Sequence, residues 1–127
     1  MSAYNKILSI DDSLTMRSML RKTIEEMGYE FLEASDGSSG LEVLSKEVDN
    51  VGLILLDWNM PGMNGLEFLQ AVKANIRFQS VPIIMVTTEA EKGNVIKALQ
   101  NGVKNYILKP FTNEELTLKI KQNARRS

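Results

Sequence analysis

Asp57 is the first candidate in this sequence for a residue with a chemical function. It directly follows the apolar run Leu53–Leu56 and precedes a loop set by Pro61 and Gly62. An apolar run without alternation is typical of a strand buried on both faces of a parallel sheet. Sheets of that kind bind their ligands at the carboxyl ends of the strands. The run therefore delivers a carboxylate to an expected ligand site, although an isolated Asp can also simply end a strand or cap the next element.

Three other predicted strands end on residues that could take part in the same chemistry. Two carboxylates follow the apolar run at 6–10, two hydroxyls close the run that starts at 81, and an ammonium follows the run at 105–108. In chain order, these residues are Asp11, Asp12, Thr87, Thr88 and Lys109. Because the carboxyl ends of parallel strands meet at one edge of a sheet, we expect these side chains to converge around Asp57. Each alone has a purely structural explanation, such as a helix cap, but together they predict a functional site.

Three converging carboxylates require positive charge. Two carboxylates about 4 Å apart repel by roughly 4 kcal/mol at an effective dielectric constant of about 20. The chain contains no Cys and no His, and oxygen ligands alone favour a hard cation such as Mg²⁺ or Mn²⁺. A metal-held carboxylate facing an ammonium and a hydroxyl suits attack on phosphorus, with the positive groups neutralising the phosphoryl oxygens. The residues alone therefore suggest an aspartyl phosphate on Asp57.

Five predicted strands alternate with five predicted helices. The strands are expected at 6–10, 29–34, 53–56, 81–87 and 105–108. The helices are expected at 13–27, over 41–44 and ending before 49, at 65–74, at 92–101 and at 113–125, the last with a capping box from Thr112 to Glu115. This alternation predicts a doubly wound α/β domain, with helices on both faces of a parallel five-stranded sheet and right-handed crossovers.

Composition narrows the class of protein further. A chain of 127 residues with a net charge of −1 is one domain in size and gives no electrostatic reason to bind nucleic acid or an anionic membrane. The apolar runs are too short to span a bilayer, and the N-terminus lacks the core of a signal peptide. We therefore expect a single domain over residues 1–127, located in the cytoplasm, which the absence of Cys also fits.

The sequence resembles the response-regulator receiver family over nearly its whole length. The Asp-Asp pair, the segment Asp-x-x-Met-Pro-x-x-Asn-Gly that begins at Asp57, the threonine after the fourth strand and the Lys-Pro pair at Lys109 all stand in register with that family. The resemblance implies a flavodoxin-like (βα)5 fold with sheet order 2-1-3-4-5. It also implies a signalling switch rather than an enzyme with turnover, which takes a phosphoryl group from a sensor histidine kinase with the help of Mg²⁺.

The resemblance implies a role for each acidic residue. Asp57 looks like the phosphoacceptor. The side chains of Asp11, Asp12 and Asp57 would hold the metal ion, together with the backbone carbonyl of Asn59.

Further roles are implied for residues around the phosphoryl group. Lys109 would pair with it, Thr87 would hydrogen-bond to it, and Tyr106 would be the aromatic switch that follows Thr87. Side chains that tune hydrolysis would be Asn59, Thr88 and Glu89. Thr88 departs from the family, which usually has Ala or Gly there, and we hypothesise that its size slows exchange with the phosphodonor or water.

Within the family, the chain looks most like chemotaxis receivers. The strings Asp-Asp-Ser-Leu-Thr-Met-Arg and Lys-Pro-Phe-Thr carry this likeness, and no output domain is expected after the last helix. Output would then pass through protein contacts of a monomer with a flagellar motor switch protein or another target, and a dedicated phosphatase is a further candidate partner. The expected contact face comprises Val95, Leu99, Tyr106 and Lys119.

Three alternatives stay open from the sequence. A phosphorelay or cell-cycle receiver would pass its phosphoryl group to a histidine phosphotransfer protein. A flavodoxin-like FMN carrier has the same layers, but needs a phosphate-cradling loop where this chain has Asp11 and Asp12. A phosphatase with an Asp nucleophile would need a second carboxylate two residues on, where this chain has Asn59.

Overall fold

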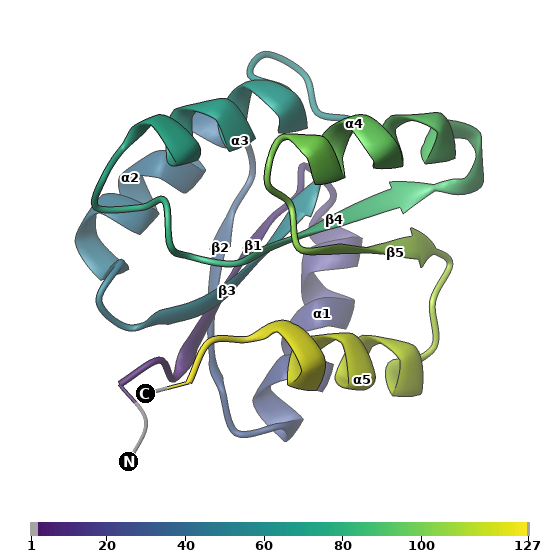
Figure 1. Ribbon diagram of the computed structural model, residues 1–127. Helices are drawn as coiled ribbons and strands as arrows, with labels where there is room; N and C mark the ends of the chain where they lie inside the picture. The colour runs from purple at the N-terminus through teal and green to yellow at the C-terminus, as the bar shows by residue number, and fades with distance from the viewer. Residues whose placement is uncertain (1–2, 127) are drawn as a thin grey trace.

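The predicted alternation of strands and helices is confirmed in the computed structural model, which describes residues 3–126 apart from the side chain of Glu89 (Figure 1). The strands are β1 (Lys6–Ile10), β2 (Glu30–Ala34), β3 (Val51–Asp57), β4 (Ile83–Thr88) and β5 (Asn105–Lys109). The helices are α1 (Leu14–Glu26), α2 (Gly37–Glu47), α3 (Gly65–Ala74), α4 (Val95–Gln100) and α5 (Asn113–Asn123). The strands are parallel and their order is β2-β1-β3-β4-β5, as the resemblance implied.

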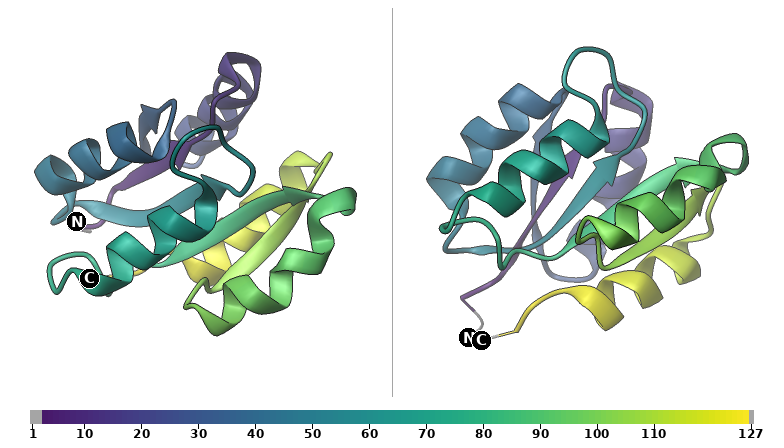
Figure 2. Two further views of the ribbon diagram at one scale, coloured as in Figure 1. Left: turned by 90° about the horizontal axis from the view of Figure 1, so that it is seen from above. Right: turned by 45° about the horizontal axis from the view of Figure 1, so that its top comes forward.

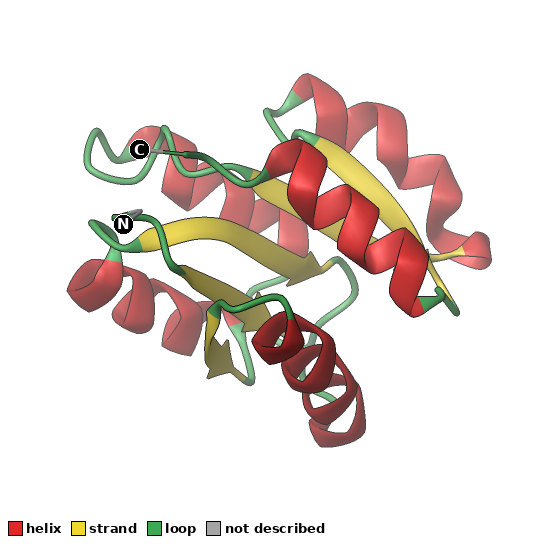
Figure 3. Cartoon of the chain, turned by 90° about the horizontal axis from the view of Figure 1, so that it is seen from below, coloured by secondary structure: helices red, strands yellow, loops and turns green. Residues whose placement is uncertain are grey.

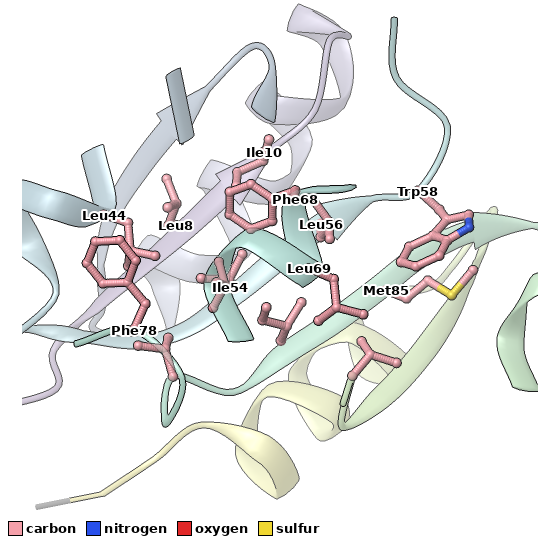
Figure 4. Close-up of a cluster of buried hydrophobic side chains, with 14 of the residues drawn as sticks. Leu8, Ile10, Leu44, Ile54, Leu56, Trp58, Phe68, Leu69, Phe78 and Met85 are labelled. Atoms are coloured by element: carbon pink, nitrogen blue, oxygen red, sulfur yellow. The ribbon is translucent and has the colours of Figure 1, made fainter. Parts of the chain in front are cut away.

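Helices cover both faces of the sheet (Figures 2 and 3), and two hydrophobic clusters join them to it. Leu53 and Leu55 pack in the cluster that also contains side chains of α1 and α5. Ile54 and Leu56 pack in the larger cluster, where side chains of β1, β3 and β4 meet those of α2 and α3 (Figure 4). All seven residues of β3 are buried, because each face of the strand is covered. This explains why the run before Asp57 is apolar without alternation.

The fourth helix differs from the prediction. The segment expected to be one helix at 92–101 starts as a 3-10 helix, η1 (Glu89–Asn94), and becomes α-helical only at Val95. Glu91 bonds back to the backbone N–H and hydroxyl of Thr88, and Gly93 adds a weak helix former inside the turn. Both features favour a tight first turn over an early α-helix.

The last helix also ends earlier than predicted. It ends at Asn123 rather than at Arg125, and Ala124 is extended. Arg125 leaves the helix because its guanidinium donates to the carbonyl oxygens of Val51 (2.9 Å) and Val48 (2.6 Å). At the start of α5, the Thr112 hydroxyl accepts from the Glu115 N–H at 3.0 Å, which is one half of the predicted capping box.

A complete capping box starts α3, although the sequence analysis did not identify it. The Asn64 side chain accepts from the Glu67 N–H at 2.9 Å, and the Glu67 carboxylate accepts from the Asn64 N–H at 3.1 Å. The helix begins against the residue that follows Asp57, since a Cβ on Gly65 would lie 2.6 Å from Trp58 Cε3 and 2.9 Å from Trp58 Cα. Within residues 3–126, no helix is long and apolar enough to cross a membrane.

Gly65→Ala is therefore expected to destabilise the protein by about 1–3 kcal/mol, the usual cost of overpacking. The clash is partly with backbone, so rotation of a side chain cannot relieve it. Gly93→Ala is the matched control, because nothing lies within 4 Å of its added Cβ, and its effect should stay within about 0.5 kcal/mol. Urea unfolding of both variants measures the difference. Equal stability of the two variants would contradict the close approach of α3 to Trp58.

Candidate functional site

The register of the central strands places two carboxylates next to each other. Ile10 of β1 pairs with Leu56 of β3, so the next residues, Asp11 and Asp57, lie level at the carboxyl ends of neighbouring strands. Asp11 is 2% exposed and Asp57 is 6% exposed. Both carboxylates are therefore largely removed from water.

The register of β4 and β5 brings the remaining strand ends to the same edge. Asp57 pairs with Val86, so Thr87 lies one residue beyond it, and Thr88 pairs with Lys109. The convergence predicted from parallel strand ends is thus present for Thr87 and Lys109.

Three carboxylates form the centre of the site. Ligand oxygens of Asp11, Asp12 and Asp57 all lie within 4.8 Å of one another, and Asp12 is exposed. Burial is the main cause, and the neighbouring Asp11 charge the second, of a pKa of Asp57 that is raised to about 6. The opposing influences on this pKa are the Lys109 ammonium and the backbone N–H of Asn59, which lies 3.4 Å from Asp57 Oδ1.

Lys109 bridges the two buried carboxylates. Its Nζ lies 3.3 Å from Asp11 Oδ2 and 3.5 Å from Asp57 Oδ1. One ammonium cannot neutralise three carboxylates, so the cluster keeps an excess of negative charge. The donors are hard oxygens on both buried and exposed side chains, a set that fits Mg²⁺ or Mn²⁺ with retained water ligands.

The two threonines after β4 point their hydroxyl groups toward a residue that the sequence analysis did not single out. The Thr87 hydroxyl, which is fully buried, lies 3.4 Å from Glu91 Oε1, and the Thr88 hydroxyl lies 3.0 Å from the same oxygen. Thr87 therefore lies at the predicted edge of the sheet while its hydroxyl is engaged by Glu91. The spacing Thr88-x-x-Glu91 is the pattern of a capping box, so the bonds between these two residues could have been predicted. The contact of Glu91 with Thr87 has no such signal, because it depends on the 3-10 turn that follows β4.

The predicted tuning residues have different positions. The exposed Asn59 and the buried Trp58 line a cavity of about 260 Å³ between the start of α3 and α4. Thr88 is half-buried beside this region. The side chain of Glu89 lies outside the described residues.

The predicted contact face needs one correction. Val95 is 8% exposed and packs in the larger core cluster, so it cannot offer its side chain to a partner. Leu99 is 43% exposed, as expected, and Ile96, which was not predicted, is 69% exposed. Val95 is the first residue of α4, and it lies on the face of this helix that packs against the sheet. On the adjoining elements, Tyr106 is half-buried, and the Lys119 ammonium lies near both its ring and the Asn105 side chain.

Arg17 is a further residue of the site that the sequence analysis did not identify. Its Nη1 donates to the backbone carbonyl of Asp11 at 2.5 Å, and its Nε donates to Glu33 Oε1 at 2.8 Å. The guanidinium thus ties the loop that carries the first two carboxylates to β2. The sequence does contain an indication of such a role. Arg17 lies in the first turn of a helix, where a cation opposes the helix dipole, and this position suggests that it has a specific partner.

Comparisons with known proteins identify the family of this chain. A sequence model of the response regulator receiver domain matches residues 7–121. The chain is 49% identical to chemotaxis protein CheY1 of Helicobacter pylori over 116 residues, which cover 91% of this chain and 93% of that protein. It is 47% identical to the chemotaxis protein CheY homolog of Campylobacter jejuni, with 91% and 88% covered.

The structure is similar to that of chemotaxis protein CheY4 of Vibrio cholerae. The TM-score is 0.85 at 33% sequence identity, and the match covers 92% of this chain and 96% of the other. Since the receiver-domain match spans most of the sequence and relatives of nearly the same length share almost half of its residues, the chain belongs to the response regulator receiver family.

Proposed function

We propose that this protein is a phosphorylation-activated response regulator of chemotaxis, and that Asp57 accepts the phosphoryl group. The observation that carries the proposal is the buried Asp57 carboxylate, which lies beside Asp11 and Asp12 and 3.5 Å from the ammonium of Lys109. Membership of the receiver family and the similarity to chemotaxis proteins support the same function.

The transfer is a displacement at phosphorus. An Asp57 oxygen forms a bond to phosphorus while the bond from phosphorus to the donor breaks, and the donor leaves with that electron pair. Asp11, Asp12, Asp57 and the backbone carbonyl of Asn59 would hold Mg²⁺, which would supply positive charge for the phosphoryl oxygens. Lys109 pairs with one of these oxygens and leaves its contacts with the unmodified carboxylates.

The modification changes the contacts available at the sheet edge. A phosphoryl group carries about −1.5 to −2 charges, in place of the single charge of the carboxylate, and several acceptor oxygens. Thr87 and Lys109 engage these oxygens, and Tyr106 follows Thr87 inward. The equilibrium between the resting and the active conformation therefore shifts. The size of the shift is the difference between the free energies of these phosphoryl contacts in the two conformations.

The surface that a partner protein recognises after phosphorylation is formed by α4, β5 and α5, with Leu99, Tyr106 and Lys119 at its centre. Lys119 Nζ lies 5.4 Å from the centre of the Tyr106 ring and 3.0 Å from Asn105 Oδ1. Movement of the ring therefore changes both the shape and the charge of this surface. We propose that it binds a flagellar motor switch protein, while a CheA-like sensor histidine kinase in the cytoplasm supplies the phosphoryl group.

The same chemistry also serves the alternative of a phosphorelay receiver. We favour chemotaxis, in which residues 1–127 act as a monomeric receiver domain through protein contacts, because the similar proteins named above are chemotaxis proteins. Phosphorylation-dependent binding to a motor-switch peptide supports this assignment. Transfer of the phosphoryl group onward to a histidine phosphotransfer protein, without such binding, supports the phosphorelay instead.

The proposed site is tested by Mg²⁺ titration followed by addition of acetyl phosphate, with the fluorescence of Trp58 as the signal. Trp58 is 8% exposed and directly follows Asp57, so its emission should report both events. We expect a saturable Mg²⁺ response and a further change with acetyl phosphate. Asp57→Asn should lose the second change. A second change that persists in this variant would show that Asp57 is not the acceptor.

The raised pKa of Asp57 predicts how stability depends on pH in EDTA. That pKa is about 6 in the folded protein and about 4 in an unfolded chain. Between these values the folded state keeps a proton that the unfolded state has lost, so wild-type stability falls as the pH rises through this window. Asp57→Asn should therefore be the more stable protein, and its advantage should grow by about 1 kcal/mol between pH 5 and pH 8. An advantage that is constant over this range in urea unfolding would contradict the raised pKa.

Arg17→Met is expected to weaken Mg²⁺ binding about tenfold, the usual effect of losing a group that orients metal ligands. The physical reason is that Arg17 fixes the Asp11 carbonyl and hence the loop to Asp12. Arg21→Met is the matched control, because Arg21 also pairs with Glu33 but stacks on the Phe31 ring. Equal Mg²⁺ affinities for the two variants would mean that Arg17 does not position the loop.

A further inference from the structure

Glu91 collects hydrogen bonds from both threonines at the end of β4. A single oxygen, Oε1, lies 3.0 Å from the Thr88 hydroxyl, 3.3 Å from the Thr88 backbone nitrogen and 3.4 Å from the Thr87 hydroxyl. The two Thr88 bonds fix the carboxylate at the start of η1. The third contact is with Thr87, the residue that must hydrogen-bond to the phosphoryl group in the proposed function.

We propose that Glu91 is a positioning residue that holds the Thr87 hydroxyl in the resting conformation, and so sets how readily this receiver accepts a phosphoryl group. The inference rests on the proposed function, because it assumes that Thr87 must reach the phosphoryl group on Asp57. The inference gives Glu91 the role of holding Thr87, and it attributes the role of Thr88 to its hydroxyl group.

The argument depends on the single proton of a hydroxyl group. Thr87 can donate one hydrogen bond, either to Glu91 or to a phosphoryl oxygen, but not to both. Thr87 is fully buried, so its hydroxyl gains from a protein acceptor when no phosphoryl group is present. Every stabilisation of the contact with Glu91 therefore lowers the population of the binding-competent conformation, and the apparent affinity falls by the same factor.

Space next to Glu91 allows the contact to open. The half-buried Glu91 borders the cavity of about 260 Å³, together with Trp58, Asn59 and Lys97. A carboxylate released from the threonines can turn into this cavity toward Lys97 and solvent. The release needs no repacking of the core, since Glu91 and Lys97 both lie outside the two hydrophobic clusters.

Thr88 acts in this arrangement through its hydroxyl and not through its size. Its hydroxyl and backbone nitrogen hold Glu91 within reach of Thr87. This differs from a steric effect on access to Asp57, and two substitutions separate the explanations. Thr88→Val keeps the size and removes the hydroxyl, whereas Thr88→Ser keeps the hydroxyl and reduces the size.

The test is a titration of the full chain with beryllofluoride, a phosphoryl mimic for carboxylates, at saturating Mg²⁺ with Trp58 fluorescence as the signal. Glu91→Ala should lower the midpoint about fivefold, which corresponds to about 1 kcal/mol. Thr88→Val should lower the midpoint as well, while Thr88→Ser should resemble wild type. Asn94→Ala is the control, because Asn94 lines the same cavity and makes no side-chain cap bond.

A double-mutant cycle with Thr87→Ala tests whether the effect passes through Thr87. If it does, Glu91→Ala should leave the midpoint unchanged in the Thr87→Ala background. Should Glu91→Ala not fold, Glu91→Gln serves instead, with a smaller decrease expected because the amide oxygen still accepts.

Three results would overturn the inference. The first is a wild-type midpoint in the Glu91 variants. The second is that Glu91→Ala lowers the midpoint as much in the Thr87→Ala background as in wild type. The third is the pattern expected from size alone, in which the midpoint of Thr88→Ser is below that of wild type and the midpoint of Thr88→Val equals it. Each of these leaves the proposed function intact, because wild type still binds the mimic. If wild type responds no more than Asp57→Asn does, the proposed function itself fails and the inference fails with it.

Discussion

Repulsion between the buried carboxylates of Asp11 and Asp57 is the constraint on which the rest of the structure depends. Both side chains are almost fully buried, and one ammonium, that of Lys109, lies between them. The sheet tolerates this repulsion because β1 and β3 are fixed by apolar packing on both faces, so the strand ends cannot move apart. The unrelieved negative charge is what makes this edge of the sheet favourable for a cation.

The site combines a rigid part with an adaptable part. Asp11, Asp57 and Lys109 are set by strand register, and changing their relative positions would require a shift of the sheet. Thr87 and Thr88 also end a strand, but their hydroxyl groups depend on Glu91 in a short 3-10 turn. Hydrogen bonds to one half-buried side chain can exchange without loss of core packing. A two-state switch needs such an element beside a fixed reaction centre.

The sequence predicted the alternation of strands and helices and the residues that meet at one edge of the sheet, because both follow from where apolar runs end, whereas the sheet order came from the family resemblance. Asp57 and Lys109 converge by the geometry of any parallel sheet, whatever the loops do. The start of the fourth helix was predicted wrongly because Gly93 and the Glu91 bonds act locally against an otherwise helical pattern. A cation in the first turn of a helix indicates that Arg17 has a specific partner. That this partner is the Asp11 carbonyl could not be predicted, since the contact depends on side-chain reach across two elements.

The position of Glu91 separates the control of this receiver from its chemistry. Substitutions at Asp57 or Lys109 act on the reacting groups themselves, so they cannot adjust the equilibrium without also changing the transfer. A competing acceptor for the Thr87 hydroxyl changes only the free energy of the resting conformation. The strength of the hydrogen bond from Thr87 to Glu91 can vary with the residues at positions 91 and 88. Neither Glu91 nor Thr88 belongs to the cluster that would hold the metal ion. Receivers that share one reaction centre can therefore differ in how readily they respond through the turn that follows β4.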